Sequence, residues 1–177
     1  DPTTQGFDVN IAGKHWGSPS GGGYHSPYNY PNLVTKEKGE YLTDRLGGEA
    51  CKFIETNKDK PFFLFVSHES PHFPFQGPDD EKKVIDETNW MEADAKTYVA
   101  MLEDLDSEVG RLLKALEESN LVKDTLVIFV SDNGGFAKAA HMGPLRGAKS
   151  STLEGGIRVP LIIRWPGRIA SGKTSDQ

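Results

Sequence analysis

Three short segments of this sequence carry side chains that could bind a cation or an anion. Asp132 and Asn133 lie in Ser-Asp-Asn-Gly-Gly and offer the hard oxygen ligands that Ca²⁺ and Mg²⁺ prefer. His72 lies in Pro-His-Phe-Pro, where two prolines restrict the backbone, so its ring could donate to an anion or a leaving oxygen. Lys149 closes the glycine-rich segment 143–149, a possible cradle for a tetrahedral oxyanion.

Each of these signals also has a purely structural interpretation. Asp-Asn-Gly-Gly is a common turn sequence, and two oxygen ligands cannot complete a calcium site of about six to eight. His72 could be a surface histidine in a proline-kinked loop. His68 precedes it by four positions, but a soft-metal pair would lack further histidine or cysteine ligands nearby. Glu154 and Arg158 are typical of residues that brace a loop.

The elements that must position these residues follow from the apolar pattern. Continuous apolar runs over 62–66 and 125–130 predict two buried strands, and 159–165 predicts a third. His72 follows the first run and Asp132 the second, so parallel strands would bring both to one edge of the sheet.

Two helices accompany these strands, one before the first strand and one between the first and the second. Apolar residues at helical spacing predict a helix over 43–57, with Thr43 as N-cap and Cys51 packing on it, and a longer amphipathic helix over 92–118. Strand, helix and strand in this order predict an α/β fold in which helices flank a mostly parallel central sheet. Residues 1–40, rich in glycine, proline and aromatic side chains, predict a long loop that lines a site or packs on another part of the protein.

Composition excludes several classes of function. The sequence has 20 Lys and Arg against 26 Asp and Glu, a formal charge of −6, and no basic cluster, so nucleic-acid binding is not expected. No apolar run approaches the ~18 residues of a membrane span, and the first residues do not form a signal peptide. A single cysteine excludes an internal disulfide framework.

Four motifs together resemble the type I sulfatases of the alkaline phosphatase superfamily: Pro71-His72-Phe73-Pro74, Ser131-Asp132-Asn133-Gly134-Gly135, Leu145-Arg146-Gly147-Ala148-Lys149 and Glu154-Gly155-Gly156-Ile157-Arg158-Val159-Pro160. The resemblance covers most of the chain and implies an alkaline phosphatase-like fold. It implies that Asp132 and Asn133 are ligands of one Ca²⁺ ion. It also implies that His72 contacts the sulfate group or the leaving oxygen, and that Lys149 binds a sulfate oxygen, which makes both catalytic and substrate-binding residues.

The chain lacks other parts of the family pattern. The family nucleophile is a formylglycine made from Cys/Ser-x-Pro-x-Arg, which is absent here, and Cys51 lacks the required proline and arginine. The remaining calcium ligands are also missing. These absences predict a central fragment, in which residues 1–177 are part of one sulfatase catalytic domain, with 1–40 as the loop and 41–177 as the α/β portion. By itself the chain is expected to be inactive.

By resemblance, the parent protein hydrolyses sulfate esters, and the expected substrate is a sulfated small molecule or glycan, with a carbohydrate favoured. His15 and Trp16 could line a sugar subsite. A phosphodiesterase or phosphonate hydrolase of the same superfamily, and a non-catalytic module that binds anions or metal, remain alternatives. The resemblance also implies a periplasmic, extracellular or lysosomal location. The sequence leaves open the linkage attacked, the oligomeric state, and the roles of His68 and His141.

Overall fold

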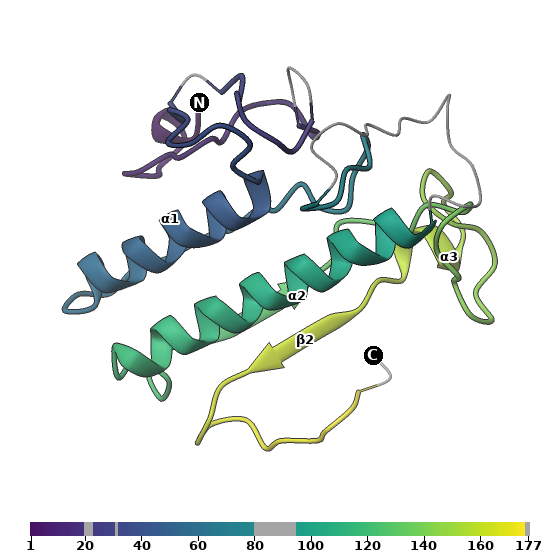
Figure 1. Ribbon diagram of the computed structural model, residues 1–177. Helices are drawn as coiled ribbons and strands as arrows, with labels where there is room; N and C mark the ends of the chain where they lie inside the picture. Colours follow the sequence, from purple (N-terminus) through teal and green to yellow (C-terminus); the bar gives the residue numbers. More distant parts are fainter. Residues whose placement is uncertain (20–22, 31, 80–94, 176–177) are drawn as a thin grey trace. The chain divides into compact units, whose positions relative to one another are not determined.

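A computed structural model describes residues 1–19, 23–30, 32–79 and 95–175, which form two compact units, Asp1–Ala115 and Leu116–Gln177. The expectation of a single catalytic domain stays a prediction. The elements follow in the order η1 (Pro2–Thr4), α1 (Leu42–Asn57), α2 (Ala95–Glu118), β1 (Val127–Val130), α3 (Glu154–Ile157) and β2 (Leu161–Arg164) (Figure 1).

Helix α1 confirms the first predicted helix but not its cap. The N-cap residue is Tyr41, whose side chain makes no capping hydrogen bond. Thr43 lies inside the first turn and is buried, so its prediction as N-cap is wrong. The helix buries Leu42, Ala50 and Ile54, the apolar stripe that fixes its position. Cys51, expected to pack, is half-buried on this helix.

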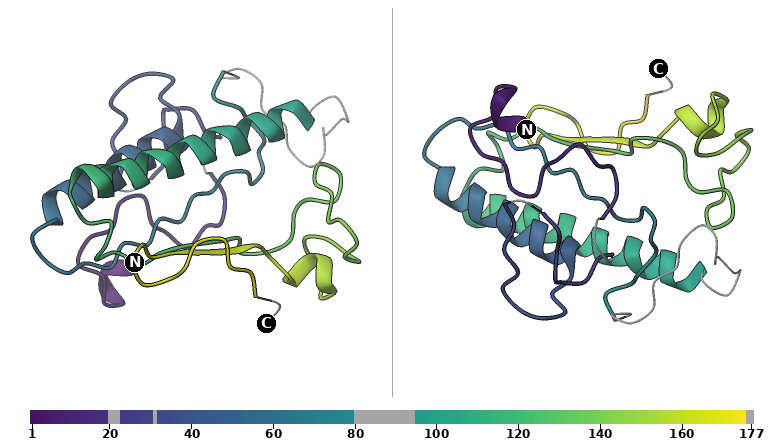
Figure 2. Two further views of the ribbon diagram at one scale, coloured as in Figure 1. Left: turned by 90° about the horizontal axis from the view of Figure 1, so that it is seen from below. Right: turned by 90° about the horizontal axis from the view of Figure 1, so that it is seen from above.

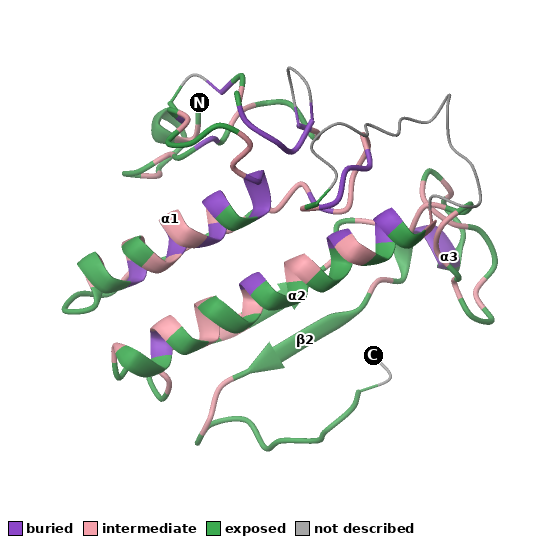
Figure 3. Cartoon of the chain, in the orientation of Figure 1, coloured by how far each residue is buried: buried purple, intermediate pink, exposed green. Residues whose placement is uncertain are grey.

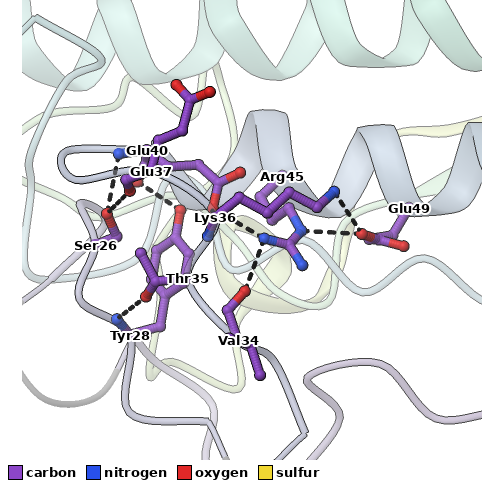
Figure 4. A network of polar contacts seen from close by, with 9 residues as sticks. All are labelled: Ser26, Tyr28, Val34, Thr35, Lys36, Glu37, Glu40, Arg45 and Glu49. Atoms are coloured by element: carbon purple, nitrogen blue, oxygen red, sulfur yellow. Dashed lines mark hydrogen bonds and ion pairs between the residues drawn. The ribbon is translucent and has the colours of Figure 1, made fainter.

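The described part of residues 1–40 contains η1 and irregular backbone, as the loop prediction requires. One buried arginine, Arg45, connects this loop to α1 (Figure 4). Arg45 Nη1 donates to the Val34 carbonyl at 3.0 Å and to Glu40 at 2.9 Å, while its Nε donates to Glu49 at 3.0 Å. Ion pairs in which the partners are this little exposed are screened less than surface pairs. The loop therefore has a defined path into the helix.

Helix α2 confirms the second predicted helix where it is described; residues 92–94 lie outside the described residues. It runs beside α1 in the same direction (Figure 2). Where the two helices meet, a methyl group on Gly47 would collide with the carboxylate of Glu108. A glycine inside a helix costs about 1 kcal/mol of stability relative to alanine. Here the missing side chain of Gly47 leaves room for the Glu108 side chain to lie against the α1 backbone.

Three carboxyl groups surround one arginine at this contact. The Asp44 carboxyl of α1 lies within hydrogen-bonding reach of Asp104 and Glu108 of α2, and Arg111 donates to Glu108. Asp104 Oδ2 and Glu108 Oε2 are buried and have no hydrogen-bond donor in the described part of the chain. Burial, with the neighbouring carboxylates, raises the pKa of Asp104 to about 6 and raises that of Glu108. A proton shared in this cluster would satisfy the two oxygens.

We expect Asp104→Asn to raise the thermal midpoint at pH 7.5 by roughly 2 to 4 °C, the shift that about 1 kcal/mol of added stability produces. This free energy is kept small because Asp104 is partly exposed and solvent screens its charge. The native pKa lies above the ordinary 3.8. Above pH ~6 the ionised Asp104 carboxylate therefore destabilises the folded wild type fully, and the protein regains stability as the pH falls through that value. The gain from the substitution should shrink by pH 4.5. Asp106→Asn, at an exposed position of α2, is the control. Equal gains for Asp104→Asn at both pH values would contradict the prediction.

The described sheet contains two strands, β1 and β2, which pair antiparallel with Val127 opposite Arg164 and Val130 opposite Leu161. These strands confirm two of the predicted ones, but the pair is antiparallel, whereas the sheet was expected to be mostly parallel. Their predicted burial is wrong: Ile128 is 55% and Ile162 60% exposed, and β2 is exposed along its length (Figure 3). Neither face of so small a sheet is fully covered by the described residues.

The first predicted strand, 62–66, has no ladder partner within the described ranges. Phe63 is 75% exposed and Phe65 68% exposed, whereas Phe62, Leu64 and Val66 are half-buried. The alternation shows an extended segment with one face partly covered. Burial on both faces was therefore a wrong prediction for this segment.

Candidate functional site

The adjacent residues Asp132 and Asn133 line one cavity of about 430 Å³ in the second unit together with Lys149, which comes from a later segment. Ser150, Ser151, Gly156 and Ile157 complete its lining. Asp132 is exposed, and Asn133 and Lys149 are half-buried. Two residues with side-chain oxygens and one residue with an ammonium group therefore line the same solvent-accessible space, a combination suited to binding a cation and an anion together.

Main-chain hydrogen bonds between three glycine-rich segments hold this cavity in shape. Gly134 N donates to Gly156 O at 2.9 Å, Lys149 N to Gly135 O at 3.0 Å, and Gly155 N to Arg146 O at 2.8 Å. A Cβ atom at Gly134 or at Gly155 would collide with a backbone carbonyl of another segment. The glycines are thus required by the close approach of main chain to main chain.

The other polar residues of these segments lie outside the cavity lining. Arg146, the other cation of segment 143–149, is exposed and contributes its carbonyl group to the frame. Glu154 and Arg158 form an exposed ion pair at 3.7 Å, in agreement with the bracing interpretation. His141 is exposed, and its Nδ1 accepts a hydrogen bond from Gly143 N at 3.1 Å.

His72 belongs to the first unit, so its convergence with the cavity residues stays a prediction. Its backbone N–H donates to Glu69 O at 2.7 Å, and its ring Nδ1 lies 2.8 Å from Phe73 O. Because a carbonyl oxygen only accepts, Nδ1 carries the hydrogen. Nε2 is then the ring nitrogen that can face a substrate. The peptide bonds before Pro71 and Pro74 are both cis.

His68 does not join His72 in a metal site in the described structure. Burial lowers the pKa of His68 to about 4, so its ring is neutral at physiological pH. Both ring nitrogens are buried, and neither has a hydrogen-bond partner among the described residues. No group of three or more His, Cys, Asp and Glu side chains gathers as a metal ion would require within those residues. The soft-metal interpretation therefore has no support here.

His15 and Trp16 lie on an exposed part of the N-terminal loop, with ring centroids 5.5 Å apart. Lys14, which sequence reasoning passed over, places its Nζ 3.9 Å from the centroid of Trp16 and 3.7 Å from that of Tyr30. Tyr30 in turn donates to Glu69 Oε2 at 2.8 Å. A series of contacts thus connects the exposed aromatic loop with the turn that carries His72.

Sequence reasoning also missed Tyr24 and Glu69, both of which contact the His72 turn. Tyr24 is 0% exposed, and its hydroxyl donates to Glu69 O at 2.7 Å and lies 3.1 Å from His72 O. Burial, opposed by the hydrogen bond from Tyr30 and by nearby Lys14, raises the pKa of Glu69. The only sequence signal was the density of aromatic residues in the first loop, which predicts packing but names no partner.

The donor set of the cavity suits a hard cation. A carboxylate and an amide are typical oxygen ligands of Ca²⁺, and Asp132 and Asn133 line the same space beside Lys149. These two side chains alone fall short of the roughly six to eight oxygens that calcium takes. The residues present therefore fit part of such a site.

Comparison with known proteins identifies the arrangement. The sulfatase family model matches residues 2–177. A sulfatase of Formosa agariphila is 37% identical over 146 residues, which are 73% of this chain and 26% of the relative. Human steryl-sulfatase is 33% identical over 159 residues, 84% of this chain and 26% of its own length. The chain thus spans about a quarter of these curated relatives.

Solved structures give the same result for the fold. The crystal structure of Ps i-CgsB matches with a TM-score of 0.68 and 36% identity over 83% of this chain and 33% of that one. The same protein has been solved in complex with k-i-k-neocarrahexaose. The PsFucS1 sulfatase from Pseudoalteromonas sp. matches with a TM-score of 0.58 and 30% identity over 75% of this chain and 26% of that one. No helix in the described ranges is long and apolar enough to cross a membrane.

Proposed function

This chain belongs to the sulfatase family, with the alkaline phosphatase-like α/β fold of its structural neighbours, and on that premise we propose that the protein containing it hydrolyses sulfate esters. The observation that carries the proposal is the shared cavity of Asp132, Asn133 and Lys149. Their types match the two needs of sulfuryl transfer, which are neutralisation of the sulfate oxygens and charge stabilisation as the ester bond breaks.

Lys149 and His72 are the proposed catalytic and substrate-binding residues of this chain. The Lys149 ammonium binds a sulfate oxygen and holds it while the sulfur–oxygen bond to the alcohol breaks. The electron pair of that bond leaves with the bridging oxygen, which takes a proton from Nε2–H of protonated His72. The Nδ1 contact with Phe73 O orients the ring for this transfer. The attacking group lies outside this chain.

Family membership implies a metal ion and a formylglycine, and we infer that the metal is one Ca²⁺ held in part by Asp132 and Asn133. When bound, it would supply positive charge at the sulfate oxygens. Asp132 and Asn133 can give it a carboxylate and an amide oxygen. Lys149 lines the same cavity and so would reach the same anion.

The proposed substrate is a sulfated glycan. A solved neighbour binds k-i-k-neocarrahexaose, and the exposed His15 and Trp16 rings offer the apolar surface on which a sugar could stack. An exported location, periplasmic, extracellular or lysosomal, remains part of the proposal through the family resemblance.

Turnover by the complete protein tests the proposal. We expect release of 4-nitrophenol from 4-nitrophenyl sulfate and of sulfate from sulfated oligosaccharides, and little turnover of bis(4-nitrophenyl) phosphate. Preferred hydrolysis of the phosphate diester would replace the proposal with the phosphodiesterase alternative. Binding of sulfated glycan and Ca²⁺ without any turnover would replace it with the non-catalytic module.

Asp132→Ala should raise the Ca²⁺ concentration that gives half-maximal activity by about 100-fold, because even loss of a residue that only supports a metal ligand costs roughly 10- to 100-fold. The measurement is activity against free Ca²⁺ after treatment with a chelator. Asp124→Asn removes an exposed carboxylate of the same unit outside the cavity lining and should leave the titration unchanged. Identical titrations for the wild type and Asp132→Ala would exclude Asp132 as a ligand.

A further inference from the structure

One hydroxyl group lies against the carbonyls at both ends of the turn from Glu69 to His72. Within the turn, His72 N donates to Glu69 O at 2.7 Å. The Tyr24 hydroxyl donates to that same carbonyl at 2.7 Å and lies 3.1 Å from the carbonyl of His72. Tyr24 precedes this turn by more than 40 residues, so the contact is made only in the folded chain.

Tyr24 is itself fixed on every side that the structure describes. Its backbone N donates to Gln76 Oε1 at 2.8 Å, and its carbonyl accepts from Leu42 N at 2.7 Å. Its ring stacks on Tyr41 at 5.6 Å between centroids and is fully buried. Burial raises the pKa of Tyr24 well above its usual value, so the hydroxyl keeps its proton and remains a donor.

The His72 ring continues this chain of contacts. Its Nδ1 lies 2.8 Å from the carbonyl of the next residue, Phe73. Phe73 stacks on the buried Phe75 with 3.9 Å between centroids. The backbone of His72 is thus fixed by Tyr24 and its ring by the Phe73 carbonyl, which together determine the direction of Nε2.

We propose that Tyr24 is a positioning residue for His72, aiming its Nε2 at the leaving oxygen through the two turn carbonyls. This inference rests on the role given to His72 in the proposed function. An angstrom-scale displacement of a catalytic group can cost about 100-fold in rate, so one hydrogen bond at the base of the turn is enough to matter.

The chain provides a matched control in Tyr41. It is also buried, at 4% exposed, and its hydroxyl donates to Gln76 O at 2.8 Å. Tyr41→Phe therefore removes a buried tyrosine hydroxyl from the same unit but none that contacts the His72 turn. A merely structural role for Tyr24 would give the two phenylalanine variants the same effect.

The experiment measures kcat and KM of the complete protein for two substrates, 4-nitrophenyl sulfate and a monosaccharide sulfate. Tyr24→Phe should lower kcat about 10-fold for the sugar ester, with little change in KM. The loss should be smaller for the nitrophenyl ester, because its leaving group needs less help from a proton donor. Loss of folded protein would instead lower both rates by the same factor.

A double-mutant cycle with His72→Ala shows whether Tyr24 acts through His72. We expect Tyr24→Phe to cause no further loss once His72 is removed, and Tyr41→Phe to leave kcat unchanged. Additive losses, equal losses on both esters, or equal effects of the two tyrosine variants would overturn the positioning role. If His72→Ala itself has no effect, the role proposed for His72 fails, and with it the inference.

Discussion

Lys149→Ala should lower kcat for sulfate ester hydrolysis by about 100- to 1000-fold, the cost typical of removing one donor that stabilises charge in a transition state. Lys149 lines the cavity with Asp132 and Asn133, and its backbone N donates to Gly135 O at 3.0 Å. Its backbone is therefore held independently of its side chain. The frame of the cavity should survive the substitution, and the Ca²⁺ concentration for half-maximal activity should change little.

Steady-state kinetics of three variants separates charge from geometry. Lys138→Ala removes an exposed cation of the same unit and should leave kcat unchanged. Lys149→Arg keeps the charge but presents it on a wider planar group, so we expect only partial recovery. A kcat for Lys149→Ala within about threefold of wild type would remove Lys149 from the catalytic residues, since a stabilising donor contributes far more than that.

Gly155→Ala should abolish activity and weaken Ca²⁺ binding, and it should destabilise the fold by about 3 kcal/mol, at the upper end of the cost of overpacking. The new Cβ would collide with the carbonyl oxygen of Gly147, which is backbone and cannot rotate away. Relief of the clash would separate Gly155 N from Arg146 O, a 2.8 Å hydrogen bond of the frame.

Gly110→Ala is the control for this prediction. It adds the same methyl group on α2, where nothing lies within 4 Å, and should stabilise the protein by about 0.5 to 1 kcal/mol because alanine favours a helix. Thermal unfolding and activity are measured for both variants. Full activity in Gly155→Ala would show that the three segments are packed less closely than described.

Sequence reasoning predicted the helices well because their signals are local. The apolar spacing over 92–118 locates α2 without knowledge of any partner. It failed for Thr43 and for the segment 62–66, where the outcome depends on distant residues. Thr43 is taken into the first turn of α1, and the 62–66 segment has no strand beside it in the described ranges. Burial of β1 was likewise inferred from its continuous apolar run, without knowledge of what would cover it.

The candidate site divides in the same way. Asp132, Asn133 and Lys149 could be named from motifs, and the structure brings them to one cavity, although their roles remain predictions. Tyr24 and Glu69 could not be named, because their contacts with the His72 turn span long stretches of sequence or pass through main-chain carbonyls. Every residue has a backbone carbonyl that can accept a hydrogen bond, so no sequence motif indicates which carbonyl is used.

The glycine frame of the cavity also bears on how such a protein could diverge. A wall made of main chain offers no side chain to exchange, and a Cβ at Gly134, Gly155 or Gly156 meets backbone atoms. Substitution within the cavity lining is therefore easiest at positions that already carry a side chain, such as Ser150 and Ile157. New substrate preferences would have to arise mainly there or in other loops, while the glycine frame would stay unchanged from one specificity to the next.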